Sequence, residues 1–203
     1  MEKLNPEELL QLKHMTSDDV PAAVDVFYES FTNLQDIFPD TLKTRQWLHG
    51  LFLDDILNKK AMHYLKIEDT KSMNEQGLPR LIAFAKWDYS MPEDRGPRFS
   101  PWSEDQSKEA CDAFFNKLEK ERKRVMGDEV HIYLDLLCTH PDYRQRGAGS
   151  ALIQFGCKAA DEGGLGVYVD ASKAGAPLYK KFKFVDKSEP GAGEIASMAR
   201  HWG

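Results

Sequence analysis

Apolar and polar residues alternate along residues 9–15, which is the two-residue period of a strand buried on one face. Residues 16–19 are of types that cap helices, and apolar positions then recur at helical spacing as far as Phe31. A further set of apolar residues, at mixed helical spacing, runs through residues 41–57. The first part of the chain therefore predicts a strand followed by two helices.

The middle of the chain predicts a hairpin of two strands, at residues 62–67 and 80–89. A polar stretch at residues 69–78 separates these two apolar runs and supplies the turn. Residues 81–87 form a nearly continuous apolar run, so we expect them to be a central strand of the sheet.

Proline and glycine divide the second half of the chain into short elements. Three prolines predict a loop at residues 91–102, and Gly163 with Gly164 ends a helix. The other expected elements are a charged helix with a solvated face at 107–123, a strand before Pro141, a helix at 148–162, a strand at 165–170, a short helix at 174–182 and strands at 184–187 and 194–201. Short strands interleaved with helices predict one domain with a mixed α/β or α+β sheet.

The composition is that of a globular protein, with 41% apolar residues, 30% charged residues and a net charge of −6. Because no basic block stands out, nucleic acid and anionic membranes are not expected as partners. No apolar run reaches the ~18 residues of a membrane span, and we expect a cytoplasmic or nuclear protein. The three cysteines form no CxxC pair and the six histidines show no ligand spacing, so we expect neither disulfides nor a metal.

A phosphate-binding turn is the strongest chemical signal in the chain. Residues 144–149 read Arg-Gln-Arg-Gly-Ala-Gly, between the strand that ends at Pro141 and a helix that begins at Ala148. Glycines let a phosphate approach the main chain, and the first amides of a helix have no acceptor within the helix. The P-loop pattern is absent, and the dinucleotide pattern fails because Leu152 stands at its third glycine.

The pattern R-x-x-G-x-G, with Leu137 and Thr139 before it and Pro-Leu-Tyr-Lys-Lys-Phe-Lys-Phe after it at residues 177–184, resembles the GNAT superfamily of acetyl-coenzyme A-dependent N-acetyltransferases. The resemblance is close over residues 133–185. It implies an α/β (α+β) GNAT acyltransferase fold: a mixed, mostly antiparallel central sheet flanked by helices, with a helical insertion before the fourth strand. Within a single domain of residues 1–203, residues 91–127 would be this insertion and could cap the acceptor site.

The same resemblance implies acetyl-coenzyme A as the cofactor and direct transfer, in a ternary complex, to a primary amine of a small molecule or peptide. The turn would hold the pyrophosphate, and the strand before it would hold the pantetheine arm. The coenzyme-binding residues implied are Leu137, Cys138, Thr139, Arg144, Gln145, Arg146, Gly147, Ala148, Gly149, Ser150, Ala171, Ser172 and Tyr179. The oligomeric state is left open by the sequence; many relatives pair through late strands, so a homodimer is one of the states to consider.

The reaction needs an oxyanion donor, an acid and a base. By resemblance, the amide of Leu137 would face the thioester oxygen, and Tyr179, with a usual pKa of about 10, would protonate the leaving thiolate. An amine of pKa about 10.4 must lose a proton at pH 7, and Asp135, directly or through water, is the candidate base. If the strand has no bulge, Tyr133, Asp135 and Leu137 point to one side and the thiol of Cys138 points away.

The acceptor pocket is expected beside the first helix, where Tyr28, Phe31 and Tyr133 would line it, although periodic aromatic residues are also typical of core packing. Lys183 replaces the family's glycine, so the turn there must be built differently. Tyr133 and Asp135 stand where arylalkylamine acetyltransferases carry histidines. These departures leave a non-catalytic acyl-coenzyme A sensor as the alternative. A kinase-like nucleotide enzyme is disfavoured because the chain has no P-loop lysine.

Overall fold

The computed structural model describes residues 10–91, 99 and 101–201. Its centre is a seven-stranded sheet in the order β1-β2-β3-β4-β5-β7-β6, in which all neighbours are antiparallel except the parallel pair β4 and β5. The strands are β1 (Leu10–His14), β2 (Met62–Met73), β3 (Pro79–Asp88), β4 (His131–Thr139), β5 (Gly166–Ser172), β6 (Val185–Asp186) and β7 (Ile195–Arg200). The prediction of a mixed, mostly antiparallel sheet is confirmed.

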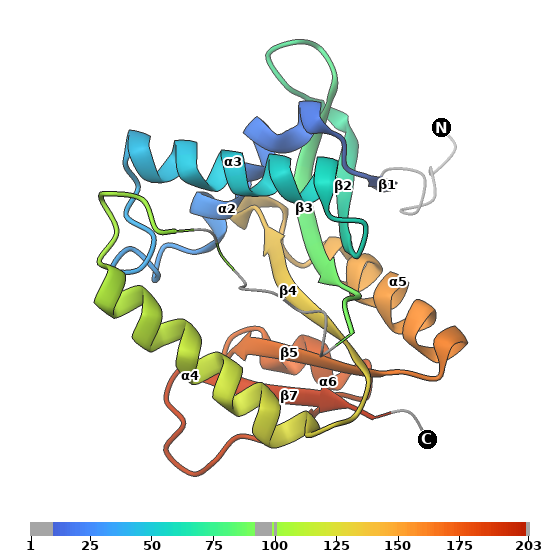
Figure 1. The fold of residues 1–203 in the computed structure, drawn as a ribbon. Coiled ribbons are helices and arrows are strands. Elements are labelled where there is room, and N and C mark those ends of the chain that lie inside the picture. Colours follow the sequence, from blue (N-terminus) through green and yellow to red (C-terminus); the bar gives the residue numbers. More distant parts are fainter. Residues whose placement is uncertain (1–9, 92–98, 100, 202–203) are drawn as a thin grey trace.

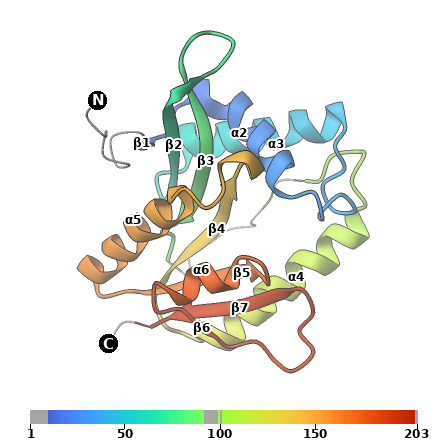
Figure 2. The ribbon, with the colours of Figure 1, turned by 180° about the vertical axis from the view of Figure 1, so that it is seen from behind.

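Helices cover both faces of this sheet. They are α2 (Val20–Ser30), α3 (Leu42–Asn58), α4 (Lys108–Met126), α5 (Ala148–Gly163) and α6 (Ala176–Lys180), with short 3-10 turns η1 (Ser17–Asp19) and η2 (Pro141–Tyr143). Figure 1 shows α3 and α4 on the near side, and Figure 2 shows α5 and α6 on the opposite side. The helix α4 stands before β4, where the sequence predicts a helical insertion.

Side-chain caps start the helices where the sequence predicts them. The Thr16 amide donates to Oδ2 of Asp19 at 2.8 Å and closes the turn before α2. The side chains of Thr41 and Ser107 accept amide hydrogen bonds at the starts of α3 and α4. β2 extends past its predicted end to Met73, because it continues to pair with β3.

The parallel strands β4 and β5 separate partway along their length. Their pairing runs from His131 with Gly166 to Leu134 with Val169 and ends there. From Asp170 onward β5 pairs with β7 on its other side, while β4 continues to pair with β3. Beyond this point, which we call the divergence, the facing edges of β4 and β5 have no strand partner within the described sheet.

β4 carries a bulge at the divergence. Lys86 of β3 pairs with Leu136, but the next residue, Trp87, pairs with Leu134. Asp135 is therefore the extra residue of the bulge. An extra residue interrupts the strict alternation of side chains between the two faces of a strand, so faces must be assigned separately on each side of Asp135.

The packing of α5 on β3 depends on Gly156. A Cβ at this position would lie 2.2 Å from Cζ2 of Trp87, whose side chain is fully buried. A close-packed core leaves the indole ring little room to move. We therefore expect Gly156→Ala to lower the free energy of unfolding by about 1–3 kcal/mol, measured by urea denaturation.

Gly50→Ala on α3 is the matched control, because no atom lies within 4 Å of the new methyl group. There alanine should raise the stability by about 0.5–1 kcal/mol, since it fits a helix better than glycine. Stabilisation by both substitutions would contradict the contact between α5 and Trp87.

Candidate cofactor and acceptor site

The turn at residues 144–149 leads from η2 into α5 and leaves its backbone open. Gly147 is the N-cap residue of α5 and has a φ of +95°, a left-handed conformation that costs energy for residues with a side chain. No atom lies within 4 Å of the position that a Cβ would take at Gly147, so there is space in front of the turn. Gln145 is left-handed as well, with a φ of +62°. A helix start with this space before it suits a phosphate group.

The two arginines of the turn donate to backbone carbonyls. The Arg144 guanidinium donates to the carbonyl oxygens of Thr139 and Ser30, at 3.3 Å each, and so ties the turn to β4 and to the end of α2. Arg146 donates to the carbonyl of Asp142 at 3.0 Å. Both side chains remain exposed, so the turn keeps a positive surface while the arginines fix its shape.

The two parts of the predicted coenzyme motif meet in space. A Cβ placed on Gly149 would lie 3.2 Å from Cδ2 of Leu178 on α6. Thr139 and Leu137 of β4 lie within 4.0 Å of the same point. The start of α5, the end of β4 and α6 therefore surround one region, although Leu137 and Leu178 are 41 positions apart in the sequence.

Tyr179 projects from α6 towards β4. It is 6% exposed, and its ring packs against Phe184 with the centres 5.6 Å apart. Burial raises the pKa of the Tyr179 hydroxyl, and the neighbouring thiol of Cys138 adds to the rise. Ala171, at the end of β5, is buried in the core beneath α6, and Ser172 accepts a hydrogen bond from the turn that leads into α6.

Asp135 lies in a group of polar side chains with a buried centre, which we call the Lys86 cluster (Asp55, Lys59, Tyr64, Lys86 and Asp135). Asp135 and Asp55 contact the Lys86 ammonium at 2.9 and 2.7 Å, and these three side chains are at most 3% exposed. Lys59 and the Tyr64 hydroxyl donate to Asp55 at 2.6 and 2.8 Å. Burial alone lowers the pKa of Lys86, but the two carboxylates outweigh it and hold this pKa above its usual value.

The bulge changes which side chains share a face of β4. Tyr133 packs with α4 and Cys138 packs with the core under α2 and α3, whereas Leu137 packs with α5 and α6 on the other face. Asp135 lies on the same side of β4 as Cys138. There burial and then the charge of Asp135 raise the pKa of the Cys138 thiol. The alternation predicted for a strand without a bulge is therefore wrong for Leu137 and Cys138. The thiol of Cys138 is buried, as the sequence predicts.

A second carboxylate, which the sequence analysis missed, lies at the divergence. Asp170 is the first residue of β5 beyond the paired part. It accepts hydrogen bonds from the hydroxyls of Tyr133 at 2.7 Å and of Tyr168 at 2.9 Å. The Arg122 guanidinium of α4 lies 4.8 Å from the ring centre of Tyr133. The available signal was the two-residue spacing of Tyr168 and Asp170, which places both on one face of a strand.

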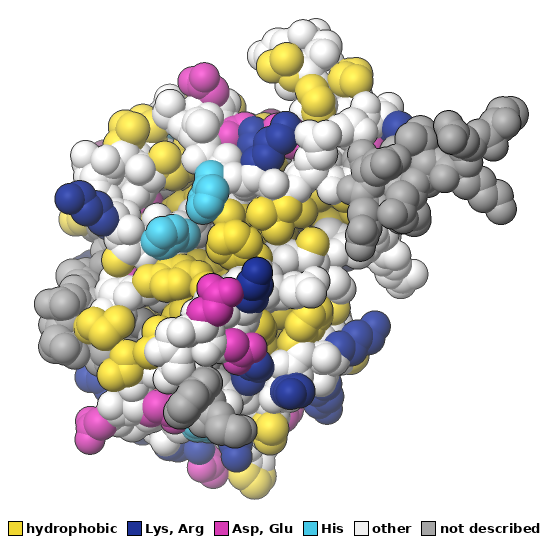
Figure 3. All heavy atoms as spheres, turned by 90° about the vertical axis from the view of Figure 1, so that its right-hand side faces the viewer, with side chains coloured by type: hydrophobic (Ala, Val, Ile, Leu, Met, Phe, Trp, Pro, Cys, Tyr) yellow, Lys and Arg dark blue, Asp and Glu magenta, His cyan; other side chains and the backbone are white. Residues whose placement is uncertain are grey.

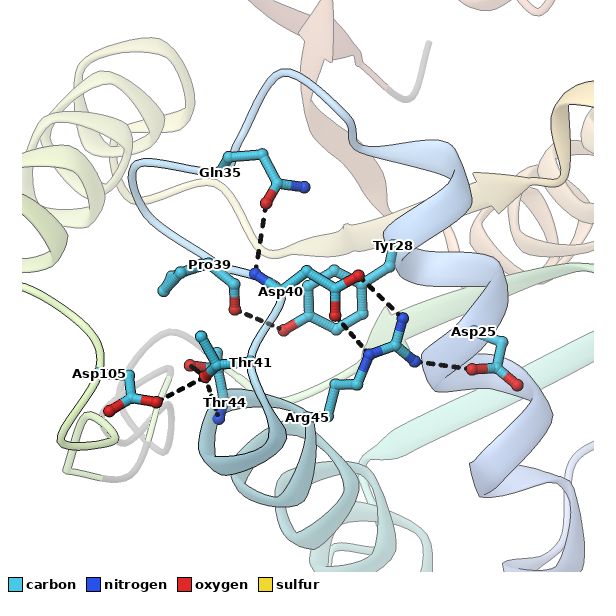
Figure 4. Close-up of polar contacts among 9 residues, drawn as sticks. All are labelled: Asp25, Tyr28, Gln35, Pro39, Asp40, Thr41, Thr44, Arg45 and Asp105. Carbon is cyan, nitrogen blue, oxygen red and sulfur yellow. Dashed lines mark hydrogen bonds and ion pairs between the residues drawn. The ribbon is translucent and has the colours of Figure 1, made fainter.

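Tyr28 belongs to a polar network between α2, α3 and the loop that joins them (Figure 4). The Arg45 guanidinium lies 4.5 Å from the centre of its ring, and its hydroxyl donates to the Pro39 carbonyl at 3.3 Å. Arg45 also contacts Asp25, at 2.7 Å, and Asp40. Burial and then the charge of Asp40 raise the pKa of Tyr28 to about 12. These contacts give Tyr28 a packing role that needs no substrate.

Phe31 follows the residue of α2 that contacts the turn at residues 144–149. It is half-buried directly after the last residue of α2. The preceding residue, Ser30, offers the carbonyl to which Arg144 donates. Of the residues predicted to line the acceptor pocket, Phe31 is thus beside the turn and Tyr133 is at the divergence.

Lys183 adopts the conformation that glycine favours. Its φ is +67°, so the turn after α6 has a left-handed residue at this position. The Lys183 side chain is exposed, while the next residue, Phe184, is only 3% exposed and packs against Tyr179. The turn therefore places the Phe184 side chain in the core, against Tyr179.

Two histidine side chains border a band of hydrophobic side chains on the side of the molecule shown in Figure 3. The rings of His14 and His63 are 6.5 Å apart, and Phe155 and Tyr89 pack against them. Burial and then the charge of His14 lower the pKa of His63.

Within residues 10–91, 99 and 101–201, no three histidine, cysteine or acidic side chains gather as ligands for a metal ion. No helix in these ranges is long and apolar enough to span a membrane.

Comparisons with known proteins found one family model that covers the turn and solved structures that share the fold. Residues 109–186 match the family model described as the acetyltransferase (GNAT) domain. The comparison with curated proteins found no match.

Three solved structures illustrate the similarity of fold. A mosquito arylalkylamine N-acetyltransferase like 5b is 15% identical, with a TM-score of 0.62 over 94% of this chain and 99% of the other. A histone acetyltransferase HPA2 and related acetyltransferase from Corynebacterium glutamicum is 21% identical, with a TM-score of 0.58 over 96% and 97%. The PaiA N-acetyltransferase of Thermoplasma acidophilum, solved with coenzyme A, is 13% identical, with a TM-score of 0.56 over 95% and 99%.

Proposed function

We propose that this chain, which carries a GNAT acetyltransferase domain, transfers the acetyl group of acetyl-coenzyme A directly to a primary amine of a small molecule or peptide in a ternary complex. The observation that carries the proposal is the open turn at Gly147 beside the divergence of β4 and β5. A phosphate group and an extended arm can therefore bind next to each other. The coenzyme A complex of a protein with this fold supports the choice of cofactor.

The residues present fit coenzyme A. The space in front of Gly147 and the first amides of α5, at Ala148, Gly149 and Ser150, suit its pyrophosphate. The open edge of β4 around Leu137 offers backbone groups to the amides of the pantetheine arm, as a neighbouring strand would. Bound acetyl-coenzyme A supplies the acetyl group as a thioester.

The chain's own groups take the remaining roles. The Leu137 amide would stabilise negative charge on the thioester oxygen. Tyr179 would donate its proton to the departing sulfur, and its burial keeps the hydroxyl protonated for this purpose. Asp135 is the base suggested by the sequence, but taking a proton would weaken its contact with Lys86.

The cofactor site can be tested by an isosteric change of charge. Gln145→Glu places a carboxylate in the exposed turn without changing the size of the side chain. Repulsion of about 1 kcal/mol from the pyrophosphate should weaken coenzyme A binding about fivefold in titration calorimetry. Gln154→Glu, on the exposed side of α5, adds the same charge away from the turn and should bind like the wild type. Equal weakening in both variants would contradict this position for the pyrophosphate.

Transfer itself is tested with acetyl-coenzyme A and a panel of primary amines: 2-phenylethylamine, hexylamine, spermidine, glucosamine and a peptide with a free N-terminus. Release of free coenzyme A with at least one amine, and the matching mass of the acetylated product, is the expected result. Tight coenzyme A binding without transfer would favour the non-catalytic sensor. Absence of coenzyme A binding would overturn both functions.

A further inference from the structure

We propose that the amine loses its proton through a path on the α4 side of the sheet, first to the hydroxyl of Tyr133 and then to the carboxylate of Asp170. The inference rests on the proposed function, because it assigns the proton transfer of that reaction. Tyr133 would be a catalytic residue in contact with the amine. Asp170 and Tyr168 would be positioning residues that act through it.

The position of the path follows from the strands. The Tyr133 hydroxyl donates to Asp170 at 2.7 Å, and the two residues are 37 positions apart in the sequence. Their hydrogen bond links β4 to β5 where the strand pairing ends, at Leu134 and Val169. The proposed thioester binds along the open edge of β4 just beyond this point. We place the attacking amine beside the Tyr133 oxygen, because Tyr133 belongs to β4 next to the divergence and packs with α4.

The geometry of the path is fixed by a second tyrosine. Tyr168 donates to Oδ1 of Asp170 at 2.9 Å, while Tyr133 donates to Oδ2, so the carboxylate is held by both oxygens. Tyr133 is 3% exposed and Tyr168 is fully buried, which keeps bulk water away from these bonds. Burial and then the charge of Asp170 raise the pKa of Tyr168, so its hydroxyl stays a donor.

Asp135 is less suited to this task because its charge is already matched. The Lys86 ammonium contacts the Asp135 carboxylate at 2.9 Å, and both side chains are at most 3% exposed. A proton on Asp135 would remove the negative partner of this buried ion pair, which is costly away from water. We therefore assign the Lys86 cluster to holding the bulge and the path at Tyr133 to moving the proton.

The proposed step conserves protons and charge. One N–H bond of the protonated amine breaks and its proton passes to the Tyr133 oxygen, while the original proton of Tyr133 passes to Oδ2 of Asp170. The nitrogen then has a lone pair and attacks the thioester carbonyl. The second proton that the nitrogen loses on forming the amide replaces the one that Tyr179 gives to the sulfur as the C–S bond breaks. Tyr133 ends neutral and unchanged, Asp170 ends as a neutral carboxylic acid, and it later returns the proton to solvent.

Charged and titratable groups surround the path on three elements. Arg122 of α4 lies over the ring of Tyr133 and is paired with Glu119 at 2.5 Å. Near Tyr168 are the charged groups Glu121 and Arg124 of α4, His131 of β4 and the hydroxyl of Ser197 of β7. The pH dependence of the path is therefore that of this whole group, with Asp170 as its final acceptor.

The test is the pH dependence of kcat/KM for the fastest amine of the panel. With a working path the wild type uses the protonated amine, so its kcat/KM should be nearly level between pH 7 and 9, below the amine pKa of about 10.4. The variants Tyr133→Phe and Asp170→Asn lack the path, so they can react only with the fraction of amine that is already unprotonated. Their kcat/KM should be about 30-fold lower at pH 7 and should rise about tenfold per pH unit until it meets the wild-type value.

Two comparisons make the outcome decisive. Asp135→Asn should keep the level profile, whatever its rate, and calorimetry with coenzyme A shows which variants retain the folded site. A level profile in either path variant that binds coenzyme A normally would overturn the path. A rising profile in Asp135→Asn alone would assign the proton to Asp135 and overturn it as well. Failure of the wild type to acetylate any amine would remove the proposed function instead.

Discussion

Replacing Tyr179 with phenylalanine is expected to lower kcat for acetyl transfer about 100-fold and to leave coenzyme A affinity within about threefold. The substitution removes the hydroxyl that would protonate the departing sulfur but keeps the ring that packs on Phe184. Because burial raises the pKa of Tyr179 above its usual value, the hydroxyl remains a donor throughout neutral pH. The loss should therefore be the same at every pH from 6 to 9. Steady-state kinetics across this range measure it.

Tyr89→Phe is the matched control, because Tyr89 is also a partly buried tyrosine whose pKa is raised by burial. Its ring packs against His63 of β2, 4.6 Å from centre to centre, and Tyr89 is not among the proposed site residues. Its kcat should equal that of the wild type. If Tyr179→Phe had an unchanged kcat at all pH values, Tyr179 would have no part in the chemistry.

Replacing Lys86 with methionine is expected to lower the free energy of unfolding by about 3–5 kcal/mol. Methionine has a similar length but no charge, so Asp55 and Asp135 would lose the ammonium between them while remaining at most 3% exposed. Two like charges in a buried site repel each other and are poorly solvated. Urea denaturation at pH 7 measures the loss.

Two further variants separate burial from charge. Lys43→Met breaks an exposed ion pair with Glu104 and should leave the free energy of unfolding nearly unchanged, because water and salt screen exposed charges. Adding Asp135→Asn to Lys86→Met removes one of the stranded charges and should recover part of the lost stability. A loss for Lys86→Met no larger than that for Lys43→Met would show that the Lys86 cluster is not buried as described.

Much of the fold follows from local patterns. The caps at Thr41 and Ser107 mark where α3 and α4 begin, and Gly164 ends α5 in a left-handed conformation. The turn at Gly147 is equally local, because its glycines and the helix after it are neighbours in the chain. Hydrogen bonds between near neighbours and the conformational preferences of single residues decide such features, so the sequence predicts them directly.

Local sequence patterns do not predict features that depend on pairing between distant strands. The bulge at Asp135 exists because β3 and β4 adopt a particular register, and it places Cys138 on the side of Asp135. Lys183 differs from the bulge, because its left-handed conformation belongs to a local turn in which the Phe184 amide donates to the Tyr179 carbonyl at 3.3 Å.

The motif residues therefore predict the shape of the turn at residues 144–149, which we propose as the cofactor turn, since its geometry is set within a few positions of the chain. The tertiary structure decides which groups surround each charged side chain. Asp135 contacts Lys86 on one adjoining strand, and Tyr133 donates to Asp170 on the other, 37 residues away. Contacts of this kind are selected when the whole sheet is packed and its buried charges are matched, because no local rule links residues so far apart.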